Sequence, residues 1–414
     1  MLPQDAVKPD YSGYCLSNVP ATILSIFGVR ESRPLLPKNA LGDVETAGVE
    51  NVILLLCDGL GYREWKRQGA KGFIGALSKR GSVRPITTVF PSTTAAALTT
   101  VSTGLTPQEH GLPEWYVYMQ ELGEVIVTLP FARVGEGRDT LEGQMNPRAL
   151  FDGQTIFQKL RRAGVNSTSL TNRALANTSY STVSRRGSDV VPYSTASDLT
   201  VSLRRLIERA RGPNFFYAYW SYVDTIEHIY GPNTDEAGVE ASLISHAFQE
   251  GFLSKLDREA AKRTLILVTA DHGQVQVAPK KTLYMNRWER LTRALQRSPS
   301  GSMIPPWGSA RDSYLQVEED KLDVIMRYLE KKLEGVASIL RTEDAVKQGL
   351  FGINKPTRKF RRRIGNLMIL PHGTRTIWYR YRKGDSLDLR GHHGGLSEDE
   401  MTIQLAAARA SDVI

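Results

Sequence analysis

The chain has almost no cysteine, with only Cys15 and Cys57 among its 414 residues. A framework of disulfide bonds is therefore excluded, and a reducing compartment is expected. The first residues lack the basic start and apolar stretch of a secretory signal, and the apolar run at 20–29 is too short to span a bilayer. We expect a soluble, cytoplasmic protein without a membrane span.

Composition and net charge exclude few classes of protein. An apolar content of 41% is ordinary for a globular protein. The length favours one large domain with an insertion, or two domains. The net charge of +9 permits an anionic ligand such as a phosphate or a nucleic acid, but it identifies neither.

Continuous apolar runs at 51–57, 214–220 and 264–270 indicate strands that are buried on both faces. A further strand is predicted at 165–170, and segments with helical patterns lie between the strands. Strands that alternate with helices predict the α/β class, as a three-layer α/β/α sandwich with a mostly parallel central sheet.

The pattern changes twice along the chain. We expect an N-terminal arm at 1–47, a catalytic core formed by 48–280 and 365–414, and an inserted cap at 281–364. The cap contains a stretch rich in Pro, Gly and Ser, which lies between two predicted helices. These helices are expected at 284–297 and 319–334.

A basic run at 355–363 closes the cap. Such runs are most often solvated faces, and contact with nucleic acid is the less expected alternative.

In sheets of this kind, ligands bind at the carboxyl ends of the strands. Polar residues follow the predicted strands at these points: Asp58, Asp224, His228, Asp271, His272 and His393. Alone, each has an ordinary explanation, such as a helix cap or a surface pair at positions i and i+4. Together, three Asp and three His suit two divalent ions with three protein ligands each. Zinc fits such a mixed set best, and manganese or iron are alternatives.

The segment 89–104, VFPSTTAAALTTVSTG, carries seven hydroxyl side chains at the start of a predicted helix. Ser and Thr after a proline are good helix caps. A hydroxyl at a helix N-terminus is also well placed to attack phosphorus, where the positive end of the helix dipole favours phosphate. These residues alone leave both interpretations open.

Five motifs occur in a characteristic order: CDGLG, FPSTTAAALTTVSTGLTPQEHG, DTIEH, TADHG and HHGGLS. The set resembles the alkaline phosphatase superfamily and, within it, the type I phosphodiesterase/nucleotide pyrophosphatase family. The resemblance covers about 50–280 and 365–410. It implies a metal-dependent hydrolase of phosphodiester or pyrophosphate bonds, which acts on a small phosphoester through a covalent phospho-threonine intermediate.

The resemblance also implies roles for individual residues. Thr94 would be the nucleophile. One divalent ion would be held by Asp224, His228 and His393, and the other by Asp58, Asp271, His272 and the Thr94 oxygen.

Two positions depart from the family pattern, which reads Thr-Phe-Pro-Asn from the nucleophile onward, where this chain has Thr94-Ala95-Ala96-Ala97. Ala95 cannot supply the family's stacking aromatic ring, and Ala97 cannot supply its amide for a phosphate oxygen. We therefore expect weak discrimination between nucleobases. A phosphomonoesterase or phosphonate hydrolase on the same scaffold is the alternative, and a non-catalytic anion-binding protein is less expected.

Four further residues lie close to these motifs. His110 is expected to be structural, and His392 to support the neighbouring metal ligand. Trp115 and Tyr116 would either line the pocket or belong to the core.

Overall fold

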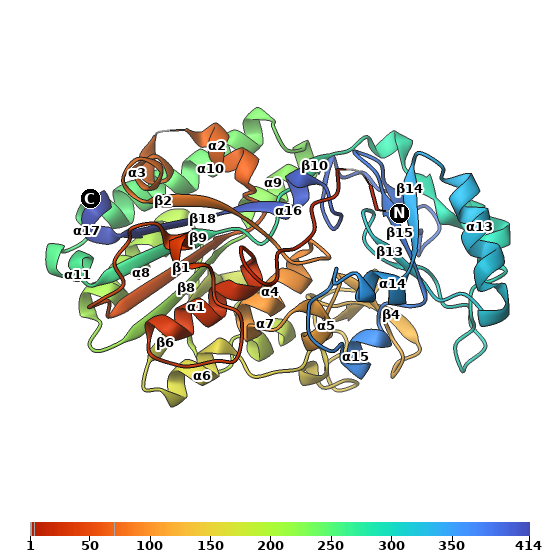
Figure 1. Cartoon of the computed structure of the whole chain (residues 1–414), viewed down its shortest axis with the longest axis horizontal. Coiled ribbons are helices and arrows are strands. Elements are labelled where there is room, and N and C mark those ends of the chain that lie inside the picture. Colours follow the sequence, from red (N-terminus) through yellow and green to blue (C-terminus); the bar gives the residue numbers. More distant parts are fainter. Residues whose placement is uncertain (1, 4, 70) are drawn as a thin grey trace.

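A seven-stranded sheet forms the centre of the protein, and helices cover both of its faces (Figure 1). The computed structural model describes residues 2–3, 5–69 and 71–414. In spatial order the strands are β2 (Ser82–Thr87), β18 (Thr402–Arg409), β9 (Thr264–Thr269), β1 (Asn51–Cys57), β8 (Asn214–Trp220), β6 (Asn166–Asn172) and β7 (Asp189–Tyr193).

The sheet is mostly parallel, as predicted. β1 pairs in parallel with β8 on one side and β9 on the other, and every residue of these three strands is buried. Only β18 runs against its neighbours, β2 and β9. Because the three central strands point the same way, their carboxyl ends lie at one edge of the sheet.

Helices connect the strands of this core. They are α1 (Val19–Ile26), α2 (Tyr62–Gln68), α3 (Gly72–Arg80), α4 (Thr94–Thr103), α5 (Pro107–His110), α6 (Ile156–Arg162), α7 (Ser179–Ser184), α8 (Ala196–Arg209), α9 (Tyr222–Tyr230), α10 (Asp235–Ala247), α11 (Arg258–Lys262), α16 (Glu398–Met401) and α17 (Ala410–Val413). The α1 helix contacts α4, and its residues Val19 and Ile23 are buried in the main core.

A second sheet lies to the right in Figure 1, beside α13 (Leu322–Lys332). Its strands, in spatial order, are β12 (Trp307–Gly308), β13 (Ser313–Leu315), β15 (Leu367–Pro371) and β14 (Ala337–Arg341). Three short helices accompany it: α12 (Glu289–Thr292), α14 (Thr342–Lys347) and α15 (Arg358–Arg361).

Two expectations for the cap differ from the structure. Residues 367–371 were expected in the core, but β15 hydrogen-bonds to β13 and β14, so the second sheet extends past the expected boundary at 364/365. The helix expected at 284–297 is reduced to α12, because Leu295 and Arg297 form antiparallel bridges with other loop residues instead.

Smaller pairings complete the fold. A three-stranded sheet contains β3 (Tyr116–Met119), β4 (Glu124–Val127) and β5 (Ala132–Arg133). Two-stranded pairs join β11 (Leu283–Tyr284) to β16 (Ile377–Trp378), and β10 (Val275–Gln276) to β17 (Gly391–His392). No helix among the described residues is long and apolar enough to cross a membrane.

Candidate metal centre and active site

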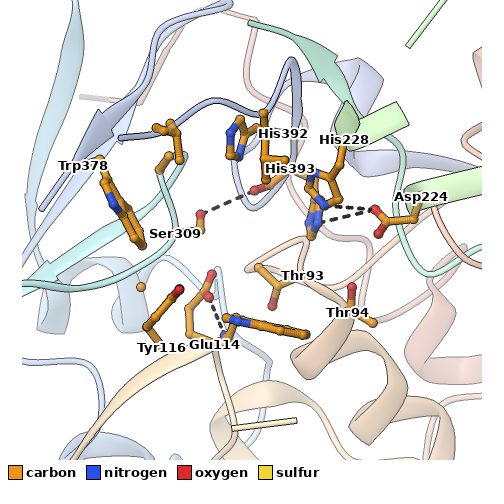
Figure 2. A pocket seen from close by; sticks show the side chains of 15 residues that line it. Thr93, Thr94, Glu114, Tyr116, Asp224, His228, Ser309, Trp378, His392 and His393 are labelled. Carbon is orange, nitrogen blue, oxygen red and sulfur yellow. Dashed lines mark hydrogen bonds and ion pairs between the residues drawn. The ribbon is translucent and has the colours of Figure 1, made fainter. Parts of the chain in front are cut away.

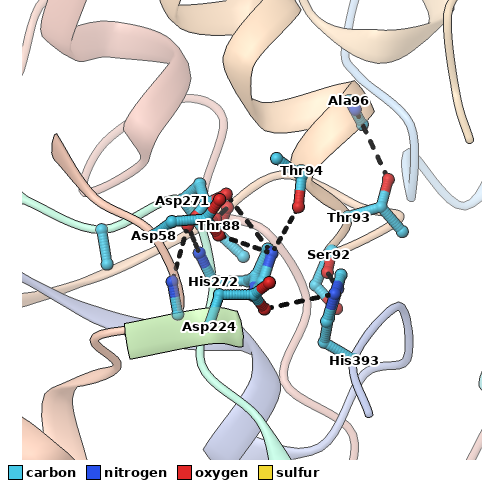
Figure 3. A network of polar contacts seen from close by, with 12 residues as sticks. Asp58, Thr88, Ser92, Thr93, Thr94, Ala96, Asp224, Asp271, His272 and His393 are labelled. Carbon is cyan, nitrogen blue, oxygen red and sulfur yellow. Dashed lines mark hydrogen bonds and ion pairs between the residues drawn. The ribbon is translucent and has the colours of Figure 1, made fainter. Parts of the chain in front are cut away.

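The ends of three neighbouring strands deliver most of the predicted ligands. Asp58 follows β1, Asp224 lies in the first turn of α9 after β8, and Asp271 follows β9. The backbone N–H of Asp224 donates to the carbonyl of Asp58 at 3.0 Å, which joins two of these strand ends directly. The carboxylates therefore meet because the strands are parallel and adjacent (Figure 3).

The predicted ligands form two overlapping groups. Asp58, Asp271 and His272 carry ligand atoms that all lie within 4.8 Å of one another, and so do Asp224, His272 and His393. His228 Nε2 lies 3.4 Å from Asp224 Oδ1, and His393 Nε2 lies 3.7 Å from the same atom. All six residues thus converge, and His272 belongs to both groups although it was assigned to one.

Hydrogen bonds to the main chain orient the three histidines. The Nδ1 atom of His228 lies 2.8 Å from the Gly391 carbonyl, and that of His393 lies 2.9 Å from the Ser92 carbonyl. His272 Nδ1 lies 3.3 Å from the carbonyl of Gly273. A carbonyl only accepts, so each Nδ1 donates its proton there and each Nε2 is turned towards the carboxylates. This is the arrangement of metal-binding histidines.

Two carboxylate oxygens in this centre lack partners. Asp58 Oδ1 and Asp271 Oδ2 are buried without a hydrogen-bond partner among the described residues. Burial, aided by the charge of Asp271, raises the pKa of Asp58 well above its usual range, and burial raises the pKa of Asp271 to about 7. Buried carboxylates of this kind need protons or cations. The donor set therefore fits divalent ions.

Asp224 behaves differently. Burial alone would raise its pKa, but the neighbouring His228, His393 and His272 outweigh burial and lower it. Its Oδ1 also accepts a hydrogen bond from the side-chain amide of Gln274. Asp224 is thus held in its charged, metal-binding form.

Thr94 is the hydroxyl that faces this centre (Figure 3). Its Oγ1 lies 3.1 Å from His272 Nε2, at the first residue of α4. Thr93 has other partners, because its Oγ1 caps α4 by accepting from the Ala96 N–H at 3.4 Å and donates to the Pro113 carbonyl at 3.2 Å. Of these two adjacent threonines, only Thr94 has its hydroxyl on a metal-ligand candidate.

Other hydroxyls of the 89–104 segment have structural partners. Ser92 Oγ donates to the Gly395 carbonyl and accepts from the Gly394 N–H, which fastens the loop that carries His393. Thr100 Oγ1 lies 3.1 Å from the Nε2 atom of His110, which is fully buried. Burial lowers the pKa of His110 to about 3, so it is a neutral, structural side chain.

A cavity of about 330 Å³ opens beside the metal ligands (Figure 2). Its lining includes Trp115 and Tyr116, as well as His392. Ala95 and Ala97 are fully buried and do not line it. The side chains at these two positions therefore do not reach the cavity.

The sequence interpretation missed several lining residues, among them Glu114, Ser309 and Trp378. Each lies in a loop or at the end of a short strand, and none belongs to a motif with a spacing of its own. Of these three, Glu114 could have been suspected from the sequence, because it lies next to Trp115 and four residues after His110.

The fold and the motifs of the chain define a class of enzyme. A mostly parallel sheet carries a cluster of Asp and His residues at its carboxyl edge, and a helix that begins at a threonine faces this cluster. The chain belongs to the type I phosphodiesterase/nucleotide pyrophosphatase family, whose match covers residues 52–396.

Known proteins of this kind are distant in sequence. The venom phosphodiesterase CdcPDE of Crotalus durissus collilineatus is 24% identical over 201 residues, which are 48% of this chain and 23% of the venom protein. The chain therefore spans only about a quarter of that relative's length.

Solved structures match over most of the chain. Murine ectonucleotide pyrophosphatase/phosphodiesterase 5, inactive and in complex with AMP, has a TM-score of 0.62 at 18% identity, over 86% of this chain and 87% of that chain. Phosphonoacetate hydrolase of Sinorhizobium meliloti 1021, in complex with phosphonoformate, has a TM-score of 0.61 at 18% identity, over 88% and 94%. Both share the fold of this chain.

Proposed function

We propose that the protein hydrolyses phosphodiester or pyrophosphate bonds with two divalent metal ions and a covalent phospho-threonine intermediate at Thr94. The observation that carries the proposal is the 3.1 Å contact between Thr94 Oγ1 and His272 Nε2, beside buried carboxylate oxygens without partners. A threonine at the start of a ten-residue helix also lies at the positive end of the helix dipole.

The residues present divide naturally between two ions. Asp224, His228 and His393 would hold one, and Asp58, Asp271 and His272 would hold the other, with the Thr94 oxygen beside it. Bound there, the ions would neutralise phosphate oxygens and lower the pKa of the Thr94 hydroxyl. The mixed Asp and His donors suit zinc best.

The chemistry then takes two displacements. In the first, Thr94 Oγ1 forms a bond to phosphorus and gives its proton to solvent, while the P–O bond to the leaving group breaks. The leaving group departs with the bonding electron pair and takes up a proton from water. In the second, a water oxygen attacks the phosphoryl-threonine, which restores the Thr94 hydroxyl and releases a phosphomonoester.

A structural neighbour and the charge of the cavity support the proposed diesterase mechanism. The murine neighbour is described as inactive when one of its threonines is replaced by alanine. Among the described residues that line the cavity, none is Lys or Arg, so the protein offers no extra positive charge for the dianion of a phosphomonoester. A diester, with one negative charge, needs less compensation.

The test compares bis(p-nitrophenyl) phosphate with p-nitrophenyl phosphate on protein of measured metal content. We expect the diester to be cleaved with the higher kcat/KM, and Thr94→Ala to remove the activity. A higher kcat/KM for the monoester would favour the phosphomonoesterase alternative. Activity that survives at a metal content near zero would contradict the mechanism.

We also infer a cytoplasmic location. Both Cys15 and Cys57 are buried, free thiols in the described chain, which suits a reducing compartment. Fractionation of source cells with an antibody to the protein tests this, and recovery outside the cytoplasm would contradict it.

A further inference from the structure

The carboxylate of Asp58 is oriented by a side chain from the neighbouring strand. Tyr219 of β8 lies opposite Leu56 of β1, two residues before Asp58, and its hydroxyl is hydrogen-bonded to Asp58 Oδ2. A phenol keeps its proton at neutral pH, so Tyr219 is the donor. The other oxygen, Asp58 Oδ1, has no partner among the described residues and lies 3.5 Å from His272 Nε2. Tyr219 therefore determines which oxygen of Asp58 faces the metal centre.

The carboxylate of Asp271 is held in a different way. Its Oδ1 accepts from the backbone N–H groups of Gly59 and His272 at 3.1 and 3.0 Å, and its Oδ2 lies 3.3 Å from His272 Nε2. Any residue except proline supplies a backbone N–H, so these bonds do not depend on the side chains of the donors. The bond to Asp58 depends instead on the single hydroxyl of Tyr219, a buried side chain. One substitution can therefore remove it.

Gln274 has a corresponding position beside Asp224. It lies two residues after His272 and is buried, and its side-chain amide donates to the main-chain carbonyl of Asp224 at 3.0 Å and to Asp224 Oδ1. The same Oδ1 atom faces the Nε2 atoms of His228 and His393. Because one amide group holds both the main chain and the carboxylate, Gln274 fixes the carboxylate in the direction of these two histidines.

We infer that Tyr219 and Gln274 are positioning residues, and that each serves one of the two proposed metal ions. The Asp58 ion is the one assigned to Asp58, Asp271 and His272, and the Asp224 ion is the one assigned to Asp224, His228 and His393. Neither Tyr219 nor Gln274 is among the described residues that line the cavity, so both act through a carboxylate and not on the substrate. The inference rests on the metal binding in the proposed function.

The experiment measures the affinity for each ion separately. His393→Ala should leave mainly the Asp58 ion, and Asp271→Ala mainly the Asp224 ion, so each background reports on one site. Zinc is titrated into the metal-free, full-length protein in competition with a chromophoric chelator. Tyr219→Phe should weaken zinc binding about tenfold or more in the His393→Ala background, as loss of a hydrogen bond to a metal ligand does, and leave it unchanged in the Asp271→Ala background. Gln274→Met should have the opposite pattern.

Tyr217→Phe is the matched control for Tyr219→Phe. Tyr217 lies two residues earlier on β8 and is also buried, so the substitution removes the same hydroxyl from the same face of the same strand. In the described part of the chain its hydroxyl makes no hydrogen bond to a ligand carboxylate. Tyr217→Phe should therefore leave the zinc affinity unchanged in both backgrounds.

The pattern of losses separates positioning from a general effect on the fold. An unchanged zinc affinity in the background where a loss is expected would overturn the role of that residue. An equal loss in both backgrounds would do the same, because a loosened core weakens both sites. If a single-site background does not fold, the otherwise unaltered protein decides: each substitution should weaken one of two bound zinc ions, and a substitution that weakens both ions or neither overturns the inference.

These outcomes are distinct from a failure of the proposed function. Wild-type protein that binds two zinc ions and cleaves bis(p-nitrophenyl) phosphate, with variants that lack the expected pattern, would overturn only the positioning roles. Wild-type protein that binds no zinc would overturn the proposed two-metal mechanism itself.

Discussion

The two halves of the cavity are built in different ways. On the metal side, Asp58, Asp224 and Asp271 come from the ends of adjacent parallel strands that are buried along their whole length. On the aromatic side, Trp378 comes from a two-residue strand and Ser309 from a loop of the second sheet. The metal side is built on the rigid central sheet, and the aromatic side is built from loops and short strands.

From this difference we expect substrate preference to depend on the aromatic side of the cavity. A side chain after a buried central strand is held by the pairing of the whole sheet, so its position tolerates little change. A side chain in a connecting segment can change without disturbing the sheet. The predictions below test whether the two halves act separately.

The largest effect is expected from removal of the metal ions. A chelator should abolish hydrolysis, and added zinc should restore it, because the metal half of the cavity holds no Lys or Arg that could replace the cations. Protein as purified should contain close to two ions per chain by elemental analysis. Asp224→Ala or His393→Ala should empty mainly one site, and Asp58→Ala or Asp271→Ala mainly the other. Full activity in the presence of chelator would refute this.

The second effect concerns the nucleophile. Thr94→Ala should lower kcat by roughly 10³-fold or more, as loss of a nucleophile does, while the protein keeps both ions and its fold. Thr94→Ser should keep part of the activity, because the oxygen remains. Thr93→Ala should cost only about 1 kcal/mol of stability, since Thr93 caps α4. An inactive Thr93→Ala beside an active Thr94→Ala would show that the nucleophile is misassigned.

The third effect concerns the contact between the core and the second sheet. Arg311, from the second sheet, donates from Nε and Nη2 to both oxygens of Glu400 at 2.9 and 2.8 Å, and both residues are buried. Glu400 in turn accepts from the Gly395 N–H, two residues after His393.

Arg311→Met should cost about 3–5 kcal/mol in urea unfolding, because Glu400 is left as a buried, unpaired charge. The double variant Arg311→Met/Glu400→Gln should recover part of that loss. If Arg311→Met were as stable as the wild type, this ion pair would not be what holds the second sheet to the core.

The fourth effect depends on pH and concerns one carboxylate of the metal side, Asp271. Burial raises the pKa of Asp271 from its ordinary 3.8 to about 7. Between these values the folded state binds more protons than the unfolded state, so the free energy of unfolding falls as pH rises. In chelator, the Tm of the wild type relative to Asp271→Asn should therefore fall from pH 4 to pH 7. A relative Tm that rises over this range would contradict the assignment.

The smallest effect is on the choice of nucleobase. Ala95 and Ala97 are fully buried, so neither the stacking ring nor the amide of the family pattern is available at these positions. The p-nitrophenyl esters of the four nucleoside 5′-monophosphates should have kcat/KM values within about tenfold of each other, since loss of one contact is worth about that much. A strong preference for one base would require a base-recognising contact elsewhere in the cavity.

The sequence predicted the central strands well, and it singled out six residues that the structure brings together. The runs at 52–57 and 215–220 are continuously apolar, and the structure forms strands that begin at the asparagine before each run. The six proposed ligands could be found because each lies in a motif at a strand end or in the final HHGGLS segment. Family membership is confirmed, whereas the metal-binding roles of these residues remain predictions.

Other parts of the fold could not be recognised from the local sequence. The strand β18 contains three consecutive alanines, which favour strands weakly, and β2 lies at the edge of the sheet and contains Pro85. The cap boundary was placed too early because β15 is as apolar as a core strand. Glu114 and Asp312 are neighbours only through the fold, since 198 positions separate them.

The position of β18 bears on how the protein is made. This strand, at residues 402–409, lies between β2 and β9, and so separates two strands that are synthesised much earlier. A nascent chain that has not been extended through residue 409 lacks this strand, so one edge of β9 is still unpaired. The sheet can thus close only once this late segment has been made and has folded in, and the earlier intermediate is an open sheet.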